Sequence, residues 1–263
     1  MKNKFVILYF RGDKMLDREK IIKNLSDKQT EVIVYDTVGS TNDLAKKLRC
    51  EGQKQFLLLA NEQTNGRGRQ GKSFFSPKDS GLYFSLTFNT QEPDFDFTGV
   101  TCAVAVACAR AIEKLTDLSP QIKWVNDIYI GSKKVCGILV QAVSNNNRIE
   151  RLIIGVGINI STVEFPEELE TIAGSLGKKI DRSIFAAEIV NNIRKLLNDK
   201  SLGYIDEYRQ KSNVLGKEIV YTQNNVPHFA KAVDIDEKGG LVVEENGEKT
   251  TLTSGEISLR FPL

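Results

Sequence analysis

The apolar positions over residues 30–212 follow two periods, one typical of helices and one typical of strands. Small apolar residues crowd the segment 98–117, which predicts a long interior helix that ends before Pro120. Shorter helices are expected over 17–25, from an N-cap at Ser40, over 184–197 and over 204–208. Strands are expected over 5–10, 32–35, 56–60, 82–88 (with alternating polarity), 121–124, 128–130, 135–143 and 149–160, the last two joined by a turn at 145–147.

The pattern changes from about Gly216 onward. Five short strands are expected over 217–222, 229–235, 241–244, 249–253 and 257–259, separated by glycine-rich turns. Closely spaced short strands of this kind predict a small β-barrel. The sequence therefore predicts an α+β domain over 1–212, with its core over about 30–212, and a small all-β domain over 216–263.

Composition narrows the class of protein. Of the 263 residues, 41% are hydrophobic and 27% are charged, which is ordinary for a soluble globular protein. The net charge of +2 is close to neutral and gives no reason to expect tight binding of nucleic acid, which needs a concentrated basic face. No apolar run approaches the ~20 residues of a membrane span, and the run at 5–10 is shorter than the core of a signal peptide.

Cysteine and histidine usage restricts the chemistry. The four cysteines stand singly with no metal-binding spacing, which indicates free thiols in a reducing cytoplasm. The single histidine, His228, lies beside Pro227 in a turn-like segment. A Ser-His-Asp or Cys-His mechanism and a zinc site are therefore not expected, and the chemistry must use lysine, arginine, carboxylates or backbone amides.

The most unusual stretch runs from Gln63 to Ser73, with three glycines and three cations between Gly66 and Lys72. Glycine allows close backbone approach to a ligand, and flexible cations neutralise phosphate. Gly66 to Ser73 also matches the P-loop expression, but a P-loop joins a strand directly to a helix, and Pro77 falls where that helix would run. A nucleotide-covering loop, a P-loop and a solvated basic loop are the three interpretations that these residues leave open.

Two further segments carry polar groups between apolar strands. In Lys123 to Asp127 a polar turn offers a carboxylate that suits magnesium. Lys134 begins an otherwise apolar strand, where it points either outward, as the pattern alone favours, or toward an anionic ligand. The glycines in Gly155 to Ile160 indicate a bulge or close packing, and taken alone this segment is a weak signal.

Six motifs, in order, resemble those of the biotin–protein ligase family. They are Ser40-Thr41-Asn42, the Gly66-Arg67-Gly68-Arg69 loop with Gln63 before it and Ser76-Pro77 after it, Lys123 to Asp127, Lys134 to Leu139, Gly155 to Ile160, and Gly255 to Arg260. The chain departs from the pattern at Val125, where the family usually has Pro, and at Phe74, where Trp is common. Neither departure removes a charged group.

The resemblance implies a catalytic domain like that of class II aminoacyl-tRNA synthetases, with a mixed or antiparallel sheet, and an SH3-like C-terminal barrel. It also implies a two-step ligase reaction. Biotin and MgATP give biotinyl-adenylate and pyrophosphate, and an acceptor lysine on a biotin carboxyl carrier domain then takes the biotin and releases AMP. No enzyme nucleophile is required, so the work is charge neutralisation and positioning.

The resemblance also assigns roles to residues. Biotin binding is expected at Ser40, Thr41, Asn42, Gln63, Gly66, Arg67, Gly68, Arg69, Lys134 and Gly137, and ATP binding at Arg69, Phe74, Lys123, Trp124, Asn126 and Asn159. Asp127 is expected to hold Mg²⁺. Lys134, Arg67 and Arg69 are the expected catalytic cations, with Lys134 bridging the biotin carboxylate and the α-phosphate.

Other interpretations stay open at this stage. A lipoate–protein ligase shares the reaction type, and a non-catalytic biotin sensor would not require the phosphate-facing set that includes Asp127 and Lys134. Only 39 residues precede Ser40, fewer than the roughly 50 of an independent domain, so we expect the short form without a winged helix and no DNA binding. A homodimer through the long strand at 149–160 is the one oligomer that the pattern suggests.

Overall fold

The protein was analysed as a computed structural model, which describes residues 16–48, 55–89, 97–145, 148–199, 201–223, 226–255 and 257–259. The expected strand over 5–10, Cys50 and two residues of the expected turn, Asn146 and Asn147, lie outside the described residues.

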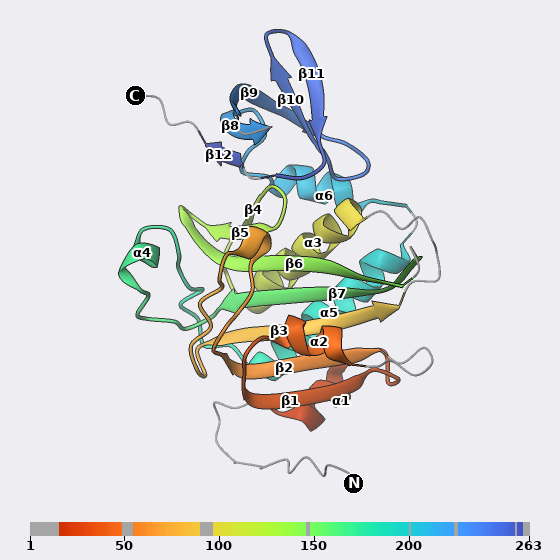
Figure 1. Ribbon diagram of the computed structural model, residues 1–263. Coiled ribbons are helices and arrows are strands. Elements are labelled where there is room, and N and C mark those ends of the chain that lie inside the picture. The colour runs from red at the N-terminus through yellow and green to blue at the C-terminus, as the bar shows by residue number, and fades with distance from the viewer. Residues whose placement is uncertain are drawn as a thin grey trace.

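The larger part of the molecule is built on a seven-stranded sheet of order β1-β2-β3-β7-β6-β5-β4 (Figure 1). Its strands are β1 (Glu31–Val38), β2 (Phe56–Gln63), β3 (Gly81–Asn89), β4 (Gln121–Lys123), β5 (Asp127–Ile130), β6 (Lys133–Asn145) and β7 (Arg148–Asn159). β1 and β2 are parallel, and every other pair is antiparallel. The expected α+β class with a mixed sheet is confirmed.

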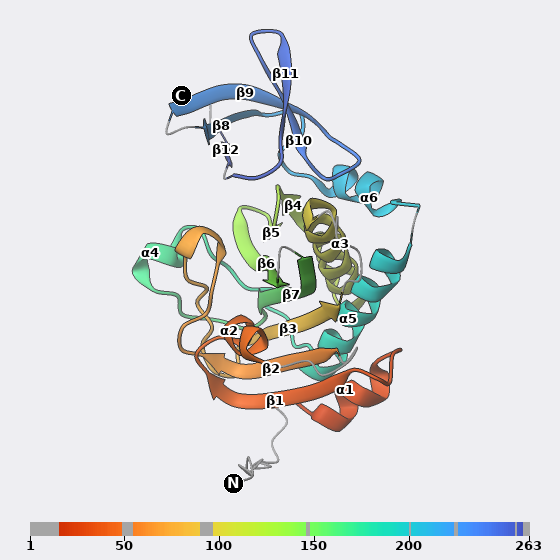
Figure 2. The ribbon, with the colours of Figure 1, turned by 45° about the vertical axis from the view of Figure 1, so that its right-hand side comes forward.

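Helices cover both faces of this sheet (Figure 2). One face packs against α1 (Arg18–Asn24), α3 (Phe97–Leu115) and α5 (Arg182–Asn198), while α2 (Thr41–Lys47) lies on the other. Along β2, Leu57 and Leu59 join the larger core, whereas Phe56 and Leu58 pack with the α2 face. Residues 81–87 of β3 are all buried, because helices cover both faces of the strand. The alternation of polarity expected over 82–88 therefore separates two buried faces, and Ser85 on the α2 face donates to Thr41 Oγ1 at 2.7 Å.

A second, five-stranded antiparallel sheet has the order β11-β10-β9-β8-β12. Its strands are β8 (Glu218–Gln223), β9 (Val226–Ile235), β10 (Leu241–Glu245), β11 (Glu248–Leu252) and β12 (Ile257–Leu259), and α6 (Tyr204–Lys211) precedes them. The two parts share one apolar core, and the Trp124 indole Nε1 donates to the Gly239 carbonyl at 2.9 Å across their boundary. In the described part of the chain, no helix has both the length and the apolar character needed to cross a membrane.

Two short helices were not expected from the sequence, and the long strand over 149–160 lies inside the sheet. The 3-10 helix η1 (Arg69–Gly71) and the helix α4 (Glu167–Glu170) were not anticipated, since neither is long enough to show a helical period. β7 is an interior strand, paired to β3 and β6 along its length. Its backbone groups over residues 151–158 are already bonded on both sides, so β7 cannot extend the sheet of a second copy there, and the homodimer suggested through residues 149–160 stays a prediction.

Candidate active site

A cavity of about 410 Å³ opens on the α2 face of the sheet. Its volume lies in the range of small-molecule sites, roughly 300–1,000 Å³. The structure brings almost all of the sequence-predicted residues to its walls, namely Ser40, Thr41, Asn42, Gln63, Arg67, Gly68, Arg69, Phe74, Lys123, Trp124, Asn126, Asp127, Lys134, Gly137 and Asn159. Gly66 does not line it. A β-carbon at Gly66 would lie 2.8 Å from Ser76 Oγ, so this glycine allows the loop to pack closely.

Three glycines on neighbouring strands leave room on the floor of the cavity for side chains from other segments. Gly137 and Gly157 pair across β6 and β7, and Gly155 lies two residues earlier on the same face. A β-carbon at Gly157 would lie 2.6 Å from Phe74 Cε1, and one at Gly155 would overlap the Asn42 amide. The glycines expected to mark close packing therefore admit Phe74 and Asn42 onto the sheet.

The N-terminal end of α2 forms a closed polar network at one side of the cavity. Ser40 caps the helix, its hydroxyl accepting from the Asp43 amide. Gln63 Oε1 accepts from the Thr41 amide at 2.9 Å, and its Nε2 donates to Ser76 Oγ at 3.0 Å. Asn42 Nδ2 donates to Gln141 Oε1 at 3.1 Å. The network fixes Ser40 to Asn42 before any ligand binds.

The loop from Gly66 to Ser76 forms a narrow turn over the cavity. The Phe74 amide donates to the Gly66 carbonyl at 3.0 Å, and the Gly68 amide donates to the Lys72 carbonyl at 2.7 Å. The turn uses positive φ at Gln70 and Gly71. No α-helix follows Ser73, where the described backbone forms bridges and a turn before β3. The P-loop interpretation is therefore wrong, since no helix dipole lies beneath the loop.

Each predicted catalytic cation has an acidic or amide partner. Arg67 Nε lies 3.0 Å from Asp43 Oδ2, and Arg69 NH1 donates to Asn126 Oδ1 at 3.1 Å. Lys134 Nζ lies 2.7 Å from Asp127 Oδ1, so its side chain turns into the cavity rather than outward as the pattern alone favoured. Lys133, expected to be solvated, makes a solvent-exposed hydrogen bond to the Glu170 carbonyl at 2.5 Å.

The segment from Lys123 to Asp127 forms one wall. Two hydrogen bonds hold Asn126 to β6. Its side-chain Nδ2 donates to the Ile138 carbonyl at 3.0 Å, and its backbone carbonyl accepts from the Ile138 amide at 2.9 Å. The Trp124–Val125 peptide bond, where the family usually has Pro, is cis. Lys123 Nζ lies 5.9 Å from the centre of the Tyr129 ring.

Asn159 faces the cavity with an unfilled acceptor. Its side chain is buried, its Nδ2 donates to the Gly174 carbonyl at 3.1 Å, and its Oδ1 has no hydrogen-bond partner among the described residues. A buried amide oxygen that lacks a partner suits a ligand donor. This geometry fits the expected position of Asn159 in the ATP site.

Several lining residues were missed by the sequence analysis. Phe165, Leu169, Ile172 and Ala173 come from the segment that contains α4, and Gly255, Ile257 and Ser258 come from the C-terminal sheet. The α4 segment is held to β6 because the Lys134 amide donates to the Ile172 carbonyl at 2.8 Å. Its apolar residues stand in a polar stretch without helical or strand period, so no local pattern marked them.

The charge of the cavity is strongly one-sided. Among the described lining residues, five cations (Arg67, Arg69, Lys72, Lys123 and Lys134) face one carboxylate, Asp127. Clustered cations in a partly desolvated cleft attract and stabilise a polyanion. Burial also raises the pKa of Tyr83 to about 12, so this residue, whose ring meets the Phe74 ring edge-on, stays neutral at physiological pH.

The residues present fit a magnesium ion that arrives with a nucleotide. No group of three His, Cys, Asp or Glu side chains gathers anywhere in the described residues, so the protein offers no complete metal cage there. Mg²⁺ usually takes one or two carboxylates plus substrate phosphates. Asp127, the one carboxylate among the described lining residues, meets this requirement for a single carboxylate.

Comparison with known families gives two matches on this chain. Residues 34–159 match the biotin/lipoate A/B protein ligase family, and residues 214–260 match the biotin protein ligase C terminal domain. The first match contains most of the cavity residues, and the second contains the barrel residues that line it.

Relatives and solved structures agree with these matches. A bifunctional ligase/repressor BirA from Bacillus spizizenii is 30% identical over 87% of this chain and 74% of its own length. A biotin–[acetyl-CoA-carboxylase] ligase from Mycobacterium tuberculosis is 24% identical over 88% of each chain. The structure of a biotin protein ligase from Aquifex aeolicus in complex with biotin and ATP aligns with a TM-score of 0.75 and 29% identity, covering 88% of this chain and 98% of that one.

Proposed function

Because the chain belongs to the biotin/lipoate A/B protein ligase family, as a biotin–protein ligase, we propose that its cavity binds biotin and ATP side by side and joins them as biotinyl-adenylate. The enzyme activates biotin with ATP and transfers it to protein. The assignment of individual residues to these steps is the proposal.

One observation carries the residue assignment. Among the lining residues that the structure describes, five cations face a single carboxylate, beside a preformed polar network on α2. A triphosphate and a carboxylate together carry several negative charges, which this excess of cations offsets. The uncharged polar end at Ser40, Thr41, Asn42 and Gln63 suits the ureido ring of biotin, which both donates and accepts hydrogen bonds.

In the first step, a biotin carboxylate oxygen attacks the α-phosphorus of ATP, and the bond to the β-phosphate oxygen breaks to release pyrophosphate. Lys134, which turns into the cavity beside Asp127, is the residue we assign to the carboxylate and the α-phosphate, where its ammonium group would offset the negative charge. Arg67 and Arg69, held by Asp43 and Asn126 in the loop, are assigned to the same reacting groups. Mg²⁺ bound to the phosphates would be held by Asp127 and would neutralise the leaving pyrophosphate.

In the second step, a neutral acceptor lysine amine attacks the biotinyl carbonyl carbon, AMP leaves, and the attacking nitrogen loses a proton. Members of this family act on biotin carboxyl carrier proteins, and the substrate of this enzyme is a carrier of that class. The intermediate is a reactive anhydride, so the covering loop from Gly66 to Ser76 must also exclude water.

The location and partners complete the proposal. The described cysteines, Cys102, Cys108 and Cys136, are buried thiols outside any disulfide, which supports a cytoplasmic enzyme. Residues 18–38 contribute α1 and β1 to the catalytic part, and the expectation that the protein does not bind DNA stays a prediction. A homodimer stays a prediction, and β7 offers no free strand edge for it over residues 151–158.

The direct test of the residue assignment is Lys134→Ala, with Lys133→Ala as the matched control on the adjacent residue. Loss of a preorganised charge at a reacting group costs about 100-fold to 1,000-fold in rate. We expect Lys134→Ala to slow biotinyl-adenylate formation by this factor in single-turnover measurements. Lys133→Ala should change the same rate by no more than about twofold, and the melting temperature of each variant checks that it is folded. Equal rates for the two variants would refute the role of Lys134.

A further inference from the structure

Outside the cavity, a turn over residues 77–81 joins two of its walls. The Ser80 carbonyl accepts from the amides of Ile160 and Ser161 at 3.1 and 2.8 Å, which fixes the end of β7. The Pro77 carbonyl accepts from the Tyr83 hydroxyl at 3.0 Å, and Tyr83 supports Phe74. We call residues 77–81 the anchor turn. A displacement of this turn would move both the Phe74 wall and the Asn159 wall.

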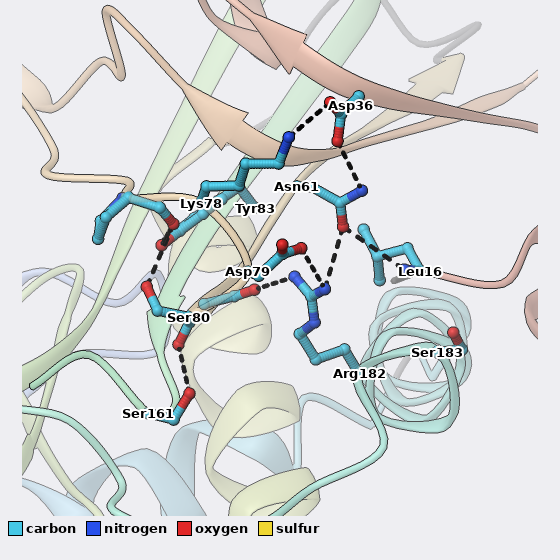
Figure 3. Close-up of polar contacts among 12 residues, drawn as sticks. Leu16, Asp36, Asn61, Lys78, Asp79, Ser80, Tyr83, Ser161, Arg182 and Ser183 are labelled. Carbon is cyan, nitrogen blue, oxygen red and sulfur yellow. Dashed lines mark hydrogen bonds and ion pairs between the residues drawn. The ribbon is translucent and has the colours of Figure 1, made fainter. Parts of the chain in front are cut away.

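A buried arginine on α5 holds the anchor turn from the opposite face of the sheet (Figure 3). Arg182, only 8% exposed, donates from NH1 to the Gly81 carbonyl at 3.1 Å. From NH2 it donates to Asn61 Oδ1 at 3.0 Å and to Asp79 Oδ1 at 3.1 Å. These contacts tie the first residues of β3 to β2 and to the first turn of α5.

The path from Arg182 to the cavity is short. Gly81, whose carbonyl Arg182 holds, is the register partner of Asn159 on β7. Asn159 lines the cavity with its buried, unpartnered Oδ1, although Arg182 itself does not line it. One hydrogen bond and one strand pair therefore separate the guanidinium from the nucleotide side of the site.

Stability alone gives a poor account of this arginine. Burial of a charged group carries a desolvation cost that a single ion pair often fails to offset, and apolar side chains of similar size frequently serve stability as well. What an apolar side chain cannot do is hold three oxygens at fixed relative positions. Asp79 also adopts a positive φ of 58°, a conformation that non-glycine residues rarely adopt without such constraint.

We propose that Arg182 is a positioning residue for the nucleotide half of the active site. It holds the anchor turn, and thereby Asn159 and the start of the segment that contains α4, in the geometry that accepts ATP. This inference rests on the proposed function, because it takes the Asn159 side of the cavity to be the nucleotide side.

The chain offers a matched control on the same helix. Arg194 on α5 has a side chain that is 14% exposed, lies 2.9 Å from Asp27 Oδ2 and donates to Thr30 and Gln55. Its partners lie before the first residues of β1 and β2, whereas Arg182 acts at Gly81 beside the cavity. Arg194→Lys therefore reports the cost of weakening a buried arginine network without touching the anchor turn.

The test compares Arg182→Lys with Arg194→Lys in biotin-dependent pyrophosphate–ATP exchange, together with the melting temperature of each. We expect Arg182→Lys to raise the ATP KM about 10-fold to 100-fold, the size of effect that a small misplacement of a binding group produces. The biotin KM should stay within about twofold, and Arg194→Lys should lower the melting temperature with an unchanged ATP KM. Equal ATP KM values for the two variants would overturn the proposal.

A second measurement separates this inference from the proposed function. Trp124 is the only tryptophan of the sequence and lines the cavity, so its fluorescence reports ATP binding without any turnover. Arg182→Lys and Asp79→Asn should both weaken ATP binding in this titration, while Arg194→Lys should not. A wild type that binds ATP but shows no biotin-dependent exchange would contradict the proposed function, and the titration would still decide the role of Arg182.

Discussion

At the scale of single residues, the site depends on glycines that carry no side chain as well as on the side chains that line the cavity. Gly155 leaves room for the Asn42 amide on the sheet, and Gly157 leaves room for the Phe74 ring. Any β-carbon at these positions would force the neighbour into the cavity, because the strand backbone is paired on both sides and cannot retreat.

We therefore expect Gly155→Ala to displace Asn42 and to raise the biotin KM by at least about tenfold, equivalent to about 1.4 kcal/mol. Gly39→Ala is the control, since a β-carbon at Gly39 meets nothing within 4 Å. Steady-state kinetics with biotin varied at saturating ATP check the prediction. An unchanged biotin KM in Gly155→Ala would mean that Asn42 does not frame the biotin pocket.

The residues that sequence reasoning found share one property: they occur in short motifs whose order is informative. Lys134 illustrates the limit, because the pattern alone favoured an outward side chain, and only the resemblance placed it at the ligand. Arg182 and Ser80 carry no motif. Arg182 donates to the Gly81 carbonyl 101 residues away, and the Ser80 carbonyl accepts from the amides of Ile160 and Ser161, 80 and 81 residues away. Contacts of that range are set by the fold, so no local pattern predicts them.

At the scale of elements, capping explains why helices begin where they do. Asp181 caps α5, its Oδ1 accepting from the amides of Ser183 and Ile184 at 3.0 and 3.1 Å. Burial raises the pKa of Asp181, but hydrogen bonds from Lys20 and these amides outweigh it and hold the pKa below its ordinary value. Ionised Asp181 thus stabilises the helix that carries Arg182.

This lowered pKa predicts how Asp181→Asn behaves with pH. A group with a lowered folded pKa contributes stability that is fully present above its unfolded pKa of about 3.9 and is lost as pH falls through the folded pKa. At pH 7 the variant should melt about 2 °C below the wild type, since it keeps a capping oxygen but loses the charge. The difference should shrink below about pH 4 in thermal melts; a difference that grows on acidification would contradict the assignment.

Most long elements were predictable because their apolar period is local, as in α3 and in the hairpin of β6 and β7. The order of the strands was not, since β3 pairs with β7 across α3 and three intervening strands. α4 spans only four residues, from Glu167 to Glu170, too few to show a helical period. β3 alternates between two buried faces rather than between core and solvent, because α2 covers one face and α5 packs on the other.

At the scale of the whole molecule, the two expected domains are packed as one body. Ile219, Ile235 and Leu241 of the C-terminal sheet belong to the same apolar core as α3 and β6. Trp124 and Cys102 both reach the Gly239 carbonyl, at 2.9 and 3.9 Å. The sequence marked the change of pattern near Gly216 but carried no sign of this shared core.

We therefore expect both parts to unfold in one cooperative transition. Trp124 fluorescence, which reports the boundary, and far-ultraviolet circular dichroism, which reports all elements, should give coincident melting curves. An earlier transition seen by fluorescence alone would show that the C-terminal sheet separates first, and that its contacts at the cavity are weaker than the shared core implies.

The most direct test of the whole account is pyrophosphate–ATP exchange with biotin and lipoate supplied in separate reactions. The cavity, with its cations beside a preformed polar network on α2, predicts exchange with biotin and none with lipoate. Exchange with lipoate alone, or biotin binding without exchange, would contradict the conclusion that this protein activates biotin as its adenylate.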